Sequence, residues 1–257
     1  KIMLVVAHGD DETFIFGGTV AKYAQLGYQI DLLVLTKDLN ENKIEELREA
    51  SKTLGIKNVI QKDYYPTFTY SHSGKCITNN VLTEIPSSTI VKEIYQEIHM
   101  NNPDVILTFD PTGVSGHPDH IYVNECTRSA VKIYAERKTE ARLYEIVFLS
   151  KLFSVQYNIR KLGQKIKALF FYTDKSTLNP IVSISQEVST KVRVASWLDI
   201  RQRAIMCHST SFQEGRWYLK LFEKMNYRIR GFIIPSENYF RAYPENTDFD
   251  DSTSFFN

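Results

Sequence analysis

The sequence lacks the features that mark secreted, membrane-spanning and nucleic-acid-binding proteins. It holds three cysteines in 257 residues, an odd and widely spaced set that indicates free thiols in a reducing compartment, not a disulfide framework or a thiolate zinc site. No apolar run approaches the roughly 20 residues that a membrane span needs. The formal net charge of +1 offers no basic excess for nucleic acid. We therefore expect a cytoplasmic protein with no membrane span and no nucleic-acid partner.

Other absences bear on the organisation of the chain. The spacing G-x-G-x-x-G does not occur, so Gly17-Gly18 does not indicate a nicotinamide or flavin cofactor. Internal repeats and Pro/Ser-rich linkers are missing, which favours a single domain over residues 1–257. The chain opens at Lys1 inside an apolar run, so we expect an N-terminal segment to precede it. Its last ten residues, 248–257, are expected to form a loose tail.

What the sequence does contain is an alternation of apolar runs and amphipathic stretches over its first 135 residues. This pattern predicts an α/β fold, a Rossmann-like and mostly parallel sheet with helices on both faces. The expected strands are 3–6, 30–35, 58–60 and 105–109, and the expected helices are 17–27, 41–54, 89–101 and 119–135. The second half is less regular, with strands expected at 143–149 and 168–172 and a largely helical stretch at 184–207.

Two polar clusters follow predicted strands. The first is His8-Gly9-Asp10-Asp11-Glu12, after the first strand, and the second is Gly116-His117-Pro118-Asp119-His120, after a later one. Both belong at the carboxyl edge of the sheet, where open α/β sheets bind ligands. Taken singly, either cluster could simply cap the helix that follows it. Together they supply three imidazoles and several carboxylates, a donor set that suits a catalytic zinc ion.

The paired clusters resemble the two signature motifs of the LmbE-like, or PIG-L, family of deacetylases, A-H-P-D-D-E and H-P-D-H. The resemblance is strong over about residues 1–125, weak from 137 to 199, and returns faintly near 201–210. It implies a Rossmann-like fold and hydrolysis of N-acetyl groups on glucosamine-type conjugates with a divalent metal, usually zinc. The metal ligands that it implies are His8, Asp11 and His120.

The resemblance also implies catalytic roles for residues beside those ligands. The general base is Asp10, which would take the proton of the attacking water. His117 would stabilise the oxyanion and protonate the leaving amine, and Asp119 would support it by pairing with its imidazolium. We therefore expect His117 to be protonated in the active enzyme.

Substrate contacts are less well defined by the sequence. Lys43 stands where many family members have a substrate-binding arginine, Asp63 resembles a position that binds sugar hydroxyls, and His208 falls near the pocket or in the core. A lysine keeps the charge of an arginine but loses its planar fork. Two other functions stay open at this point, a metal-dependent phosphoester hydrolase and a non-catalytic protein that binds metal or sugar.

Overall fold

The protein is described here by a computed structural model that places residues 1–67, 79–138, 140–147, 187–210, 234–244 and 253–256. Within these ranges the strands join into one seven-stranded sheet of order β3-β2-β1-β4-β5-β7-β6. The strands β1 to β5 run parallel, whereas β7 is antiparallel to β5 and β6 is antiparallel to β7. The strands are β1 Ile2–Val6, β2 Ile30–Thr36, β3 Asn58–Tyr64, β4 Val105–Thr108, β5 Arg142–Val147, β6 Thr190–Arg193 and β7 Ser236–Tyr243.

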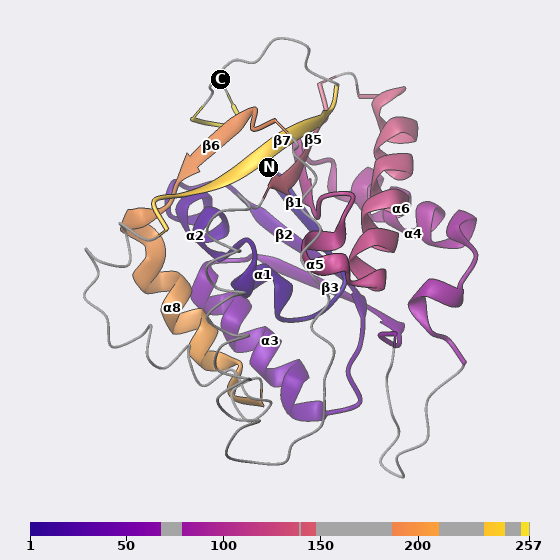
Figure 1. Ribbon diagram of the computed structural model, residues 1–257, viewed down its shortest axis with the longest axis horizontal. Helices are drawn as coiled ribbons and strands as arrows, with labels where there is room; N and C mark the ends of the chain where they lie inside the picture. Colours follow the sequence, from indigo (N-terminus) through magenta and orange to yellow (C-terminus); the bar gives the residue numbers. More distant parts are fainter. Residues whose placement is uncertain (68–78, 139, 148–186, 211–233, 245–252, 257) are drawn as a thin grey trace, which may run out of the picture.

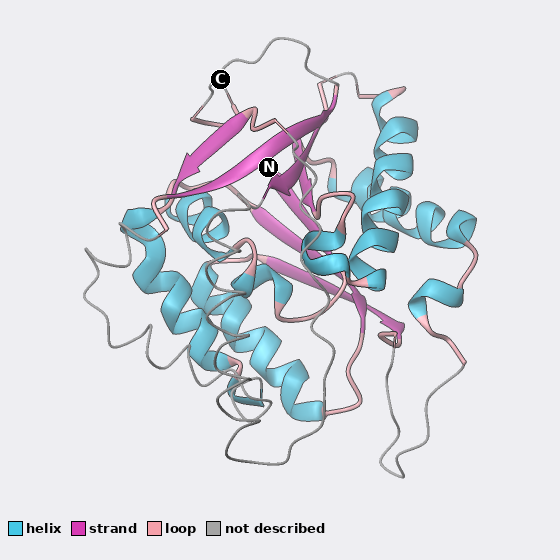
Figure 2. Ribbon diagram, in the orientation of Figure 1, coloured by secondary structure: helices cyan, strands magenta, loops and turns pink. Residues whose placement is uncertain are grey.

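Helices cover both faces of this sheet. Helices α2, α3 and α8 pack together on one face, and α4 and α6 pack together on the other (Figures 1 and 2). Their bounds are α1 Asp11–Phe14, α2 Gly17–Gln25, α3 Glu41–Leu54, α4 Ser87–Asn101, α5 Gly113–Gly116, α6 Pro118–Ala135 and α8 Leu198–Cys207, with 3₁₀ turns η1 Leu82–Glu84 and η2 Ala195–Trp197. In the described part of the chain, no helix is long and apolar enough to cross a membrane.

The central strands are those with continuous apolar sequence. Every residue of β1, β2 and β4 is buried, as expected for parallel strands covered on both faces. The helix predicted at 41–54 is found with those bounds, because the Asn40 side chain accepts a hydrogen bond from Asn42 N and Gly55 ends the helix with φ +85°. The predicted mostly parallel α/β sheet is thus confirmed.

The order of the strands creates a switch point between β1 and β4. From β1 the chain moves outward through β2 and β3, whereas β4 and β5 lie on the other side. The segments that leave the carboxyl ends of β1 and β4 therefore diverge, and open α/β sheets bind their ligands at such a point. These segments carry the two polar clusters predicted to hold a metal.

Gly17-Gly18 has a structural explanation. The carboxylate of Glu237, on β7, accepts hydrogen bonds from Gly18 N at 2.9 Å and Thr19 N at 2.8 Å. A Cβ at Gly18 would lie 2.6 Å from the Glu237 Oε1 atom, so only glycine lets the carboxylate approach. The start of α2, where a nucleotide phosphate would bind, is filled by a side chain of the protein.

One prediction for the second half is wrong. Within the described residues 187–207, Thr190–Arg193 forms β6 in place of the expected helix, with alternating buried and exposed residues that pair with β7. The helical part of these residues is the 3₁₀ turn Ala195–Trp197 and the α-helix Leu198–Cys207. The pairing with β7 is a long-range interaction that the local pattern does not encode. The strand expected at 168–172 and the last residues of the one expected at 143–149 lie outside the described residues.

The expected loose tail is also wrong for the part of it that is described. Phe255 is fully buried and stacks on Tyr23 with ring centroids 5.1 Å apart. Its backbone is held at both polar atoms, since Phe255 N donates to the Tyr23 hydroxyl and Arg142 donates to Phe255 O. One aromatic residue therefore fixes this end of the chain to the core.

Replacing Phe255 by alanine should lower the free energy of unfolding by about 3–5 kcal/mol, the usual cost of a Phe→Ala change in a core. Met100→Ala is the control, because Met100 is 68% exposed and should change stability by no more than about 0.5 kcal/mol. Urea denaturation of both variants measures the difference. Equal midpoints for the two would show that Phe255 does not belong to the core in solution.

Candidate metal centre

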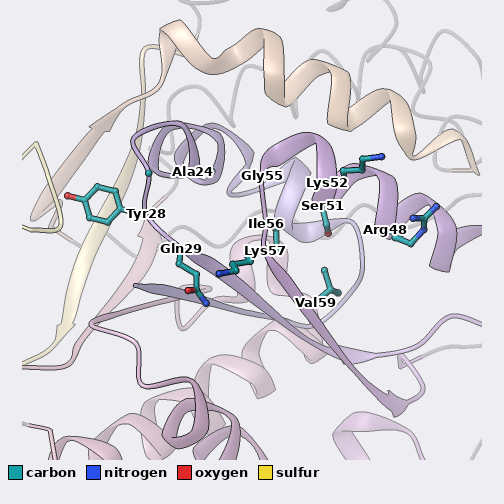
Figure 3. Close-up of a pocket in the computed structure, with 11 residues that line it drawn as sticks. Ala24, Tyr28, Gln29, Arg48, Ser51, Lys52, Gly55, Ile56, Lys57 and Val59 are labelled. Carbon is teal, nitrogen blue, oxygen red and sulfur yellow. The ribbon is translucent and has the colours of Figure 1, made fainter.

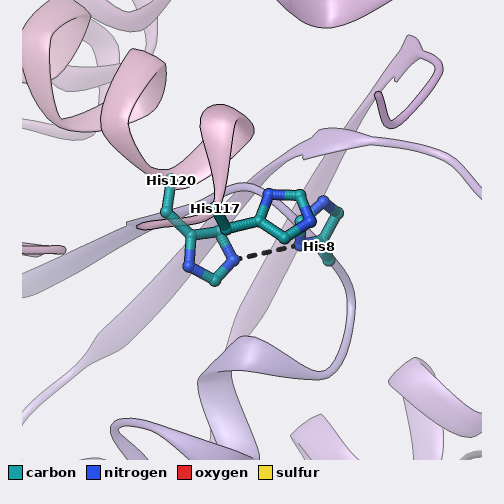
Figure 4. A group of neighbouring side chains, drawn as sticks. All are labelled: His8, His117 and His120. Atoms are coloured by element: carbon teal, nitrogen blue, oxygen red, sulfur yellow. Dashed lines mark hydrogen bonds between the residues drawn. The ribbon is translucent and has the colours of Figure 1, made fainter. Parts of the chain in front are cut away.

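Three potential ligand atoms meet at the switch point. His8 Nδ1 lies 3.2 Å from His120 Nε2, 3.4 Å separates His8 Nδ1 from Asp11 Oδ2, and 3.3 Å separates His120 Nε2 from Asp11 Oδ1. His8 follows β1, Asp11 opens α1, and His120 lies in the first turn of α6. Figure 4 shows His8 and His120 facing each other, with His117 beside them. The structure brings together the three residues predicted to bind metal.

The second nitrogen of each imidazole is held by an acceptor. His8 Nε2 donates to Asp119 Oδ2 at 2.9 Å, and His120 Nδ1 donates to the Gly113 carbonyl at 3.1 Å. The His120 ring also stacks on Phe109, with centroids 4.0 Å apart and an interplanar angle of 2°. Because these second nitrogens carry the protons, neutral His8 and His120 direct their lone pairs at each other.

This donor set fits a divalent metal ion. Two opposed lone pairs and a carboxylate repel one another unless a cation or a proton lies between them. Ligands of a tetrahedral ion at about 2.0–2.1 Å are separated by about 3.3–3.4 Å, and the three distances here are 3.2, 3.3 and 3.4 Å. His117 also lies close enough to be considered, but the set of His8, His117 and His120 spans up to 4.8 Å. The set that contains Asp11 matches the spacing better.

A proton on His8 can also relieve the repulsion between the two imidazoles and the Asp11 carboxylate. Burial lowers the pKa of His8, but hydrogen bonds with Asp11 and Asp119 outweigh it and raise this pKa to about 10. Burial would raise the pKa of Asp11, yet the neighbouring His120 and His8 hold it well below its usual range. Asp119 likewise has a lowered pKa because His8 and Thr67 donate to it. A metal ion that binds here must therefore displace a proton from His8.

The carbonyl that orients His120 belongs to a strained turn. Val114 has φ 65° and ψ −47°, which is rare for a β-branched residue and costs about 1–3 kcal/mol. The buried Asp110 carboxylate stabilises this turn by accepting a hydrogen bond from Val114 N at 2.6 Å. Gly113 is needed as well, because it has φ +63° and a Cβ there would lie 2.9 Å from Ile121 Cγ1. This role of Asp110 was not predicted from the sequence.

His117 lies beside His8 and His120, and its ring makes a contact that was not predicted. Its Nδ1 accepts a hydrogen bond from Asp119 N at 3.2 Å, so its ring caps α6. Burial and the nearby His8 and His120 lower the pKa of His117 to about 4. These contacts favour a neutral His117, with its ring proton on Nε2, over the protonated form that was expected. Its ring centroid is 4.8 Å from those of both His8 and His120.

Asp119 is also placed differently from the prediction. Its carboxylate was expected to pair with His117, but Oδ2 lies 3.9 Å from His117 Nδ1 and 2.9 Å from His8 Nε2. Thr67, in the segment after β3, donates to the same carboxylate through its backbone N–H at 3.0 Å and through its hydroxyl. Asp119 thus fixes the ligand His8, and no local signal in the sequence indicated the role of Thr67.

The remaining predicted residues are more dispersed. Asp10 is half-buried and immediately precedes α1, next to the ligand Asp11. Lys43 lies in the first turn of α3, and its Nζ forms an ion pair with Asp38 Oδ2 at 3.0 Å. Asp63 lies within β3 and not after it, and its side chain is 84% exposed. His208 is buried, and its Nε2 lies 3.1 Å from Oε1 of Glu12, the residue that follows Asp11.

A surface cavity of the described structure lies elsewhere. It has a volume of about 750 Å³ and lies where the chain enters β2 and β3, at the opposite edge of the sheet from the histidines (Figure 3). It is lined by Arg48, Ser51, Lys52 and Lys57 among others, and by no histidine or carboxylate. This cavity is not part of the metal centre.

A Rossmann-like sheet that carries two histidines and an aspartate at its switch point defines a metal-dependent α/β enzyme. The chain belongs to the PIG-L family, whose model is described as GlcNAc-PI de-N-acetylase and matches residues 3–131. Two relatives named 1D-myo-inositol 2-acetamido-2-deoxy-alpha-D-glucopyranoside deacetylase are each 24% identical to it. The protein from Actinosynnema mirum covers 94% of this chain with 92% of its own length, and that from Rhodococcus jostii covers 82% with 81%.

Solved structures share the fold. The conserved protein TT1542 from Thermus thermophilus superposes with a TM-score of 0.59 at 16% identity, over 96% of both chains. N,N'-diacetylchitobiose deacetylase from Pyrococcus horikoshii superposes with a TM-score of 0.56 at 16% sequence identity. The match covers 93% of this chain and 82% of that one. GalB, the 4-carboxy-2-hydroxymuconate hydratase from Pseudomonas putida, also superposes with a TM-score of 0.56, at 17% sequence identity. This match covers 96% of this chain and 98% of GalB. Because a hydratase shares it, the fold alone does not decide the reaction.

Metal binding should release about one proton at neutral pH. His8 has a pKa of about 10, so it holds a proton that a metal ion must displace, and the apparent affinity should rise with pH between 6 and 8 by up to about tenfold per unit. Calorimetric titration of the chelator-treated protein with Zn²⁺, in buffers of different ionisation enthalpy, counts this proton. Affinity that does not change with pH, with no proton released, would contradict the ligand assignment of His8.

Proposed function

We propose that this protein is a zinc-dependent deacetylase that hydrolyses the N-acetyl group of an N-acetylated amino sugar. One observation carries the proposal: in a chain of the PIG-L family, His8 Nδ1 and His120 Nε2 lie 3.2 Å apart, and the Asp11 carboxylate faces both, with Oδ2 3.4 Å from His8 Nδ1 and Oδ1 3.3 Å from His120 Nε2. His8, Asp11 and His120 would hold the ion.

Zinc is favoured by the donor types. Two imidazole nitrogens and one carboxylate with an open fourth position make a catalytic zinc site, and the two described cysteines, Cys126 and Cys207, are free. When bound, such an ion lowers the pKa of water and polarises the amide carbonyl. Within the described residues the one group of side chains placed to hold a metal ion is His8, His117 and His120, which shares two residues with the proposed ligands. This favours one ion over the two-ion site of many phosphoester hydrolases.

The residues beside the ligands supply the proton transfers. Asp10 directly precedes Asp11 at the start of α1, and its carboxylate would accept the proton of the attacking water and pass it to the amine as the C–N bond breaks. His117 would donate a hydrogen bond from Nε2–H to the oxygen on which negative charge develops. It acts as a neutral imidazole, because its Nδ1 is engaged by Asp119 N.

The substrate class rests on the relatives. The names of the Actinosynnema mirum and Pyrococcus horikoshii enzymes both specify an acetamido sugar, once linked to inositol and once to a second sugar. The shared part is a 2-acetamido-2-deoxy sugar with a variable partner, and we propose this as the substrate class. Lys43 and Asp63 remain the predicted contacts to the rest of the substrate.

Acetate release from a panel of such sugars tests the proposal. The panel holds N-acetylglucosamine, N,N'-diacetylchitobiose and the inositol conjugate, and metal content is measured on the same samples. Asp10→Asn should keep its zinc and lose activity by about 10²–10⁴-fold, since a carboxamide cannot accept the proton. Asp11→Asn should lose both zinc and activity.

Three results would count against the proposal. Zinc-loaded wild-type protein that releases no acetate from any member of the panel would favour a non-catalytic binding protein. Hydrolysis of phosphoesters in its place would favour the phosphoester alternative. Full activity of Asp10→Asn would remove Asp10 as the base.

A further inference from the structure

The helix that carries the ligand Asp11 is too short to hold its own shape. Helix α1 comprises four residues, Asp11–Phe14, and the Asp10 side chain makes no capping hydrogen bond to it. An isolated single turn is unstable because nucleation costs more than its few hydrogen bonds return. Asp11 can keep its 3.3 and 3.4 Å distances to the two histidines only if other elements hold α1 in place.

Arg201, on α8, holds one end of α1. Its Nε donates to Thr13 O at 3.2 Å and its Nη2 donates to Phe14 O at 2.6 Å. These are carbonyls of the last turn, which have no partner within the helix, and a cation at this end also suits the helix dipole. A Cβ at Gly17 would lie 2.9 Å from Arg201 Cγ, so the glycine lets the arginine approach this closely.

His208 holds the side of α1 that faces the core. Its Nε2 lies 3.1 Å from Glu12 Oε1 and 3.3 Å from Thr13 Oγ1, and Thr13 donates to the same glutamate oxygen at 2.7 Å. Glu12 and His208 are 0% and 2% exposed. Since Glu12 follows Asp11 directly, this buried contact fixes the backbone next to the ligand.

Both residues belong to one segment that is itself anchored. Arg201 lies on α8 and His208 is the residue at which this helix ends, so one segment of the chain supplies both contacts to α1. Beyond His208, Glu46 on α3 accepts hydrogen bonds from Ser209 Oγ, Thr210 N and Thr210 Oγ1 at 2.6–2.9 Å. The family model ends at residue 131, so α8 lies outside the part of the chain that carries the ligands.

We propose that Arg201 and His208 are positioning residues of the metal centre, which clamp α1 so that Asp11 meets His8 and His120. The proposal rests on the metal site of the proposed function, and it deepens that function by assigning a role to the second half of the chain. Neither residue contacts the ion; each acts on Asp11 through the backbone of α1.

Metal affinity tests this clamp without any substrate. Zn²⁺ dissociation constants are measured by competition with a chromophoric chelator, and the visible spectrum of the Co²⁺-loaded protein reports the ligand geometry. His208→Leu and Arg201→Met should each weaken Zn²⁺ binding by about 10–100-fold, the usual effect of removing a group that orients a ligand, and should alter the Co²⁺ spectrum. His208→Gln should restore affinity to within a few-fold of wild type, because its amide can donate to Glu12.

Arg203→Met is the matched control, since Arg203 is exposed on the same helix, and it should bind both ions like wild type. Folding of every variant is checked by circular dichroism. Arg201→Met keeps the aliphatic stem that packs on Gly17, so it decides the question if His208→Leu does not fold. A folded Arg201→Met with wild-type Zn²⁺ affinity and an unchanged Co²⁺ spectrum would overturn the clamp. If the variants weaken Zn²⁺ binding as expected but the wild-type protein releases no acetate, only the proposed deacetylation is overturned.

Discussion

The structure around the switch point depends on one close approach, that of His8 Nδ1 and His120 Nε2 at 3.2 Å, which is unfavourable unless a proton or a metal ion lies between the two nitrogens. Neither ring can turn away. Asp119 holds the far nitrogen of His8, the Gly113 carbonyl holds that of His120, and Phe109 stacks against the His120 ring. With Asp11 facing both rings, the arrangement is stable only when positive charge lies between them. The requirement for positive charge explains why the pKa of His8 is raised and why the site fits a metal ion, on which the proposed chemistry depends.

Much of the surrounding structure serves to maintain this contact. Asp110 stabilises a strained turn that aims the Gly113 carbonyl, Thr67 reaches from the segment after β3 to Asp119, and α8 reaches α1 from the second half of the chain. Each of these groups is at least partly buried, and its polar atoms find partners within the protein. Strain and buried polar groups are therefore concentrated where the ligands must be held.

The sequence was sufficient to predict the parts that depend on local pattern. The buried strands before His8 and before the second cluster, the helix from Glu41 to Leu54 and the meeting of the two clusters at one edge all follow from hydrophobic periodicity and parallel-sheet topology. What it could not predict depends on contacts between distant segments. Strand β6 exists because it pairs with β7, and Phe255 is buried because Tyr23, Tyr144 and Tyr239 surround it. The pKa of His117 is lowered because the residue is buried and lies beside His8 and His120.

The central claim is that the ion sits among His8 Nδ1, the Asp11 carboxylate and His120 Nε2. Anomalous diffraction from crystals of the zinc-loaded protein, recorded on both sides of the zinc absorption edge, tests it most directly. The account predicts one strong peak within about 2.0–2.2 Å of each of these three groups, with His117 outside the coordination sphere. A peak coordinated by His117 in place of Asp11, or a zinc ion bound away from the switch point, would contradict it.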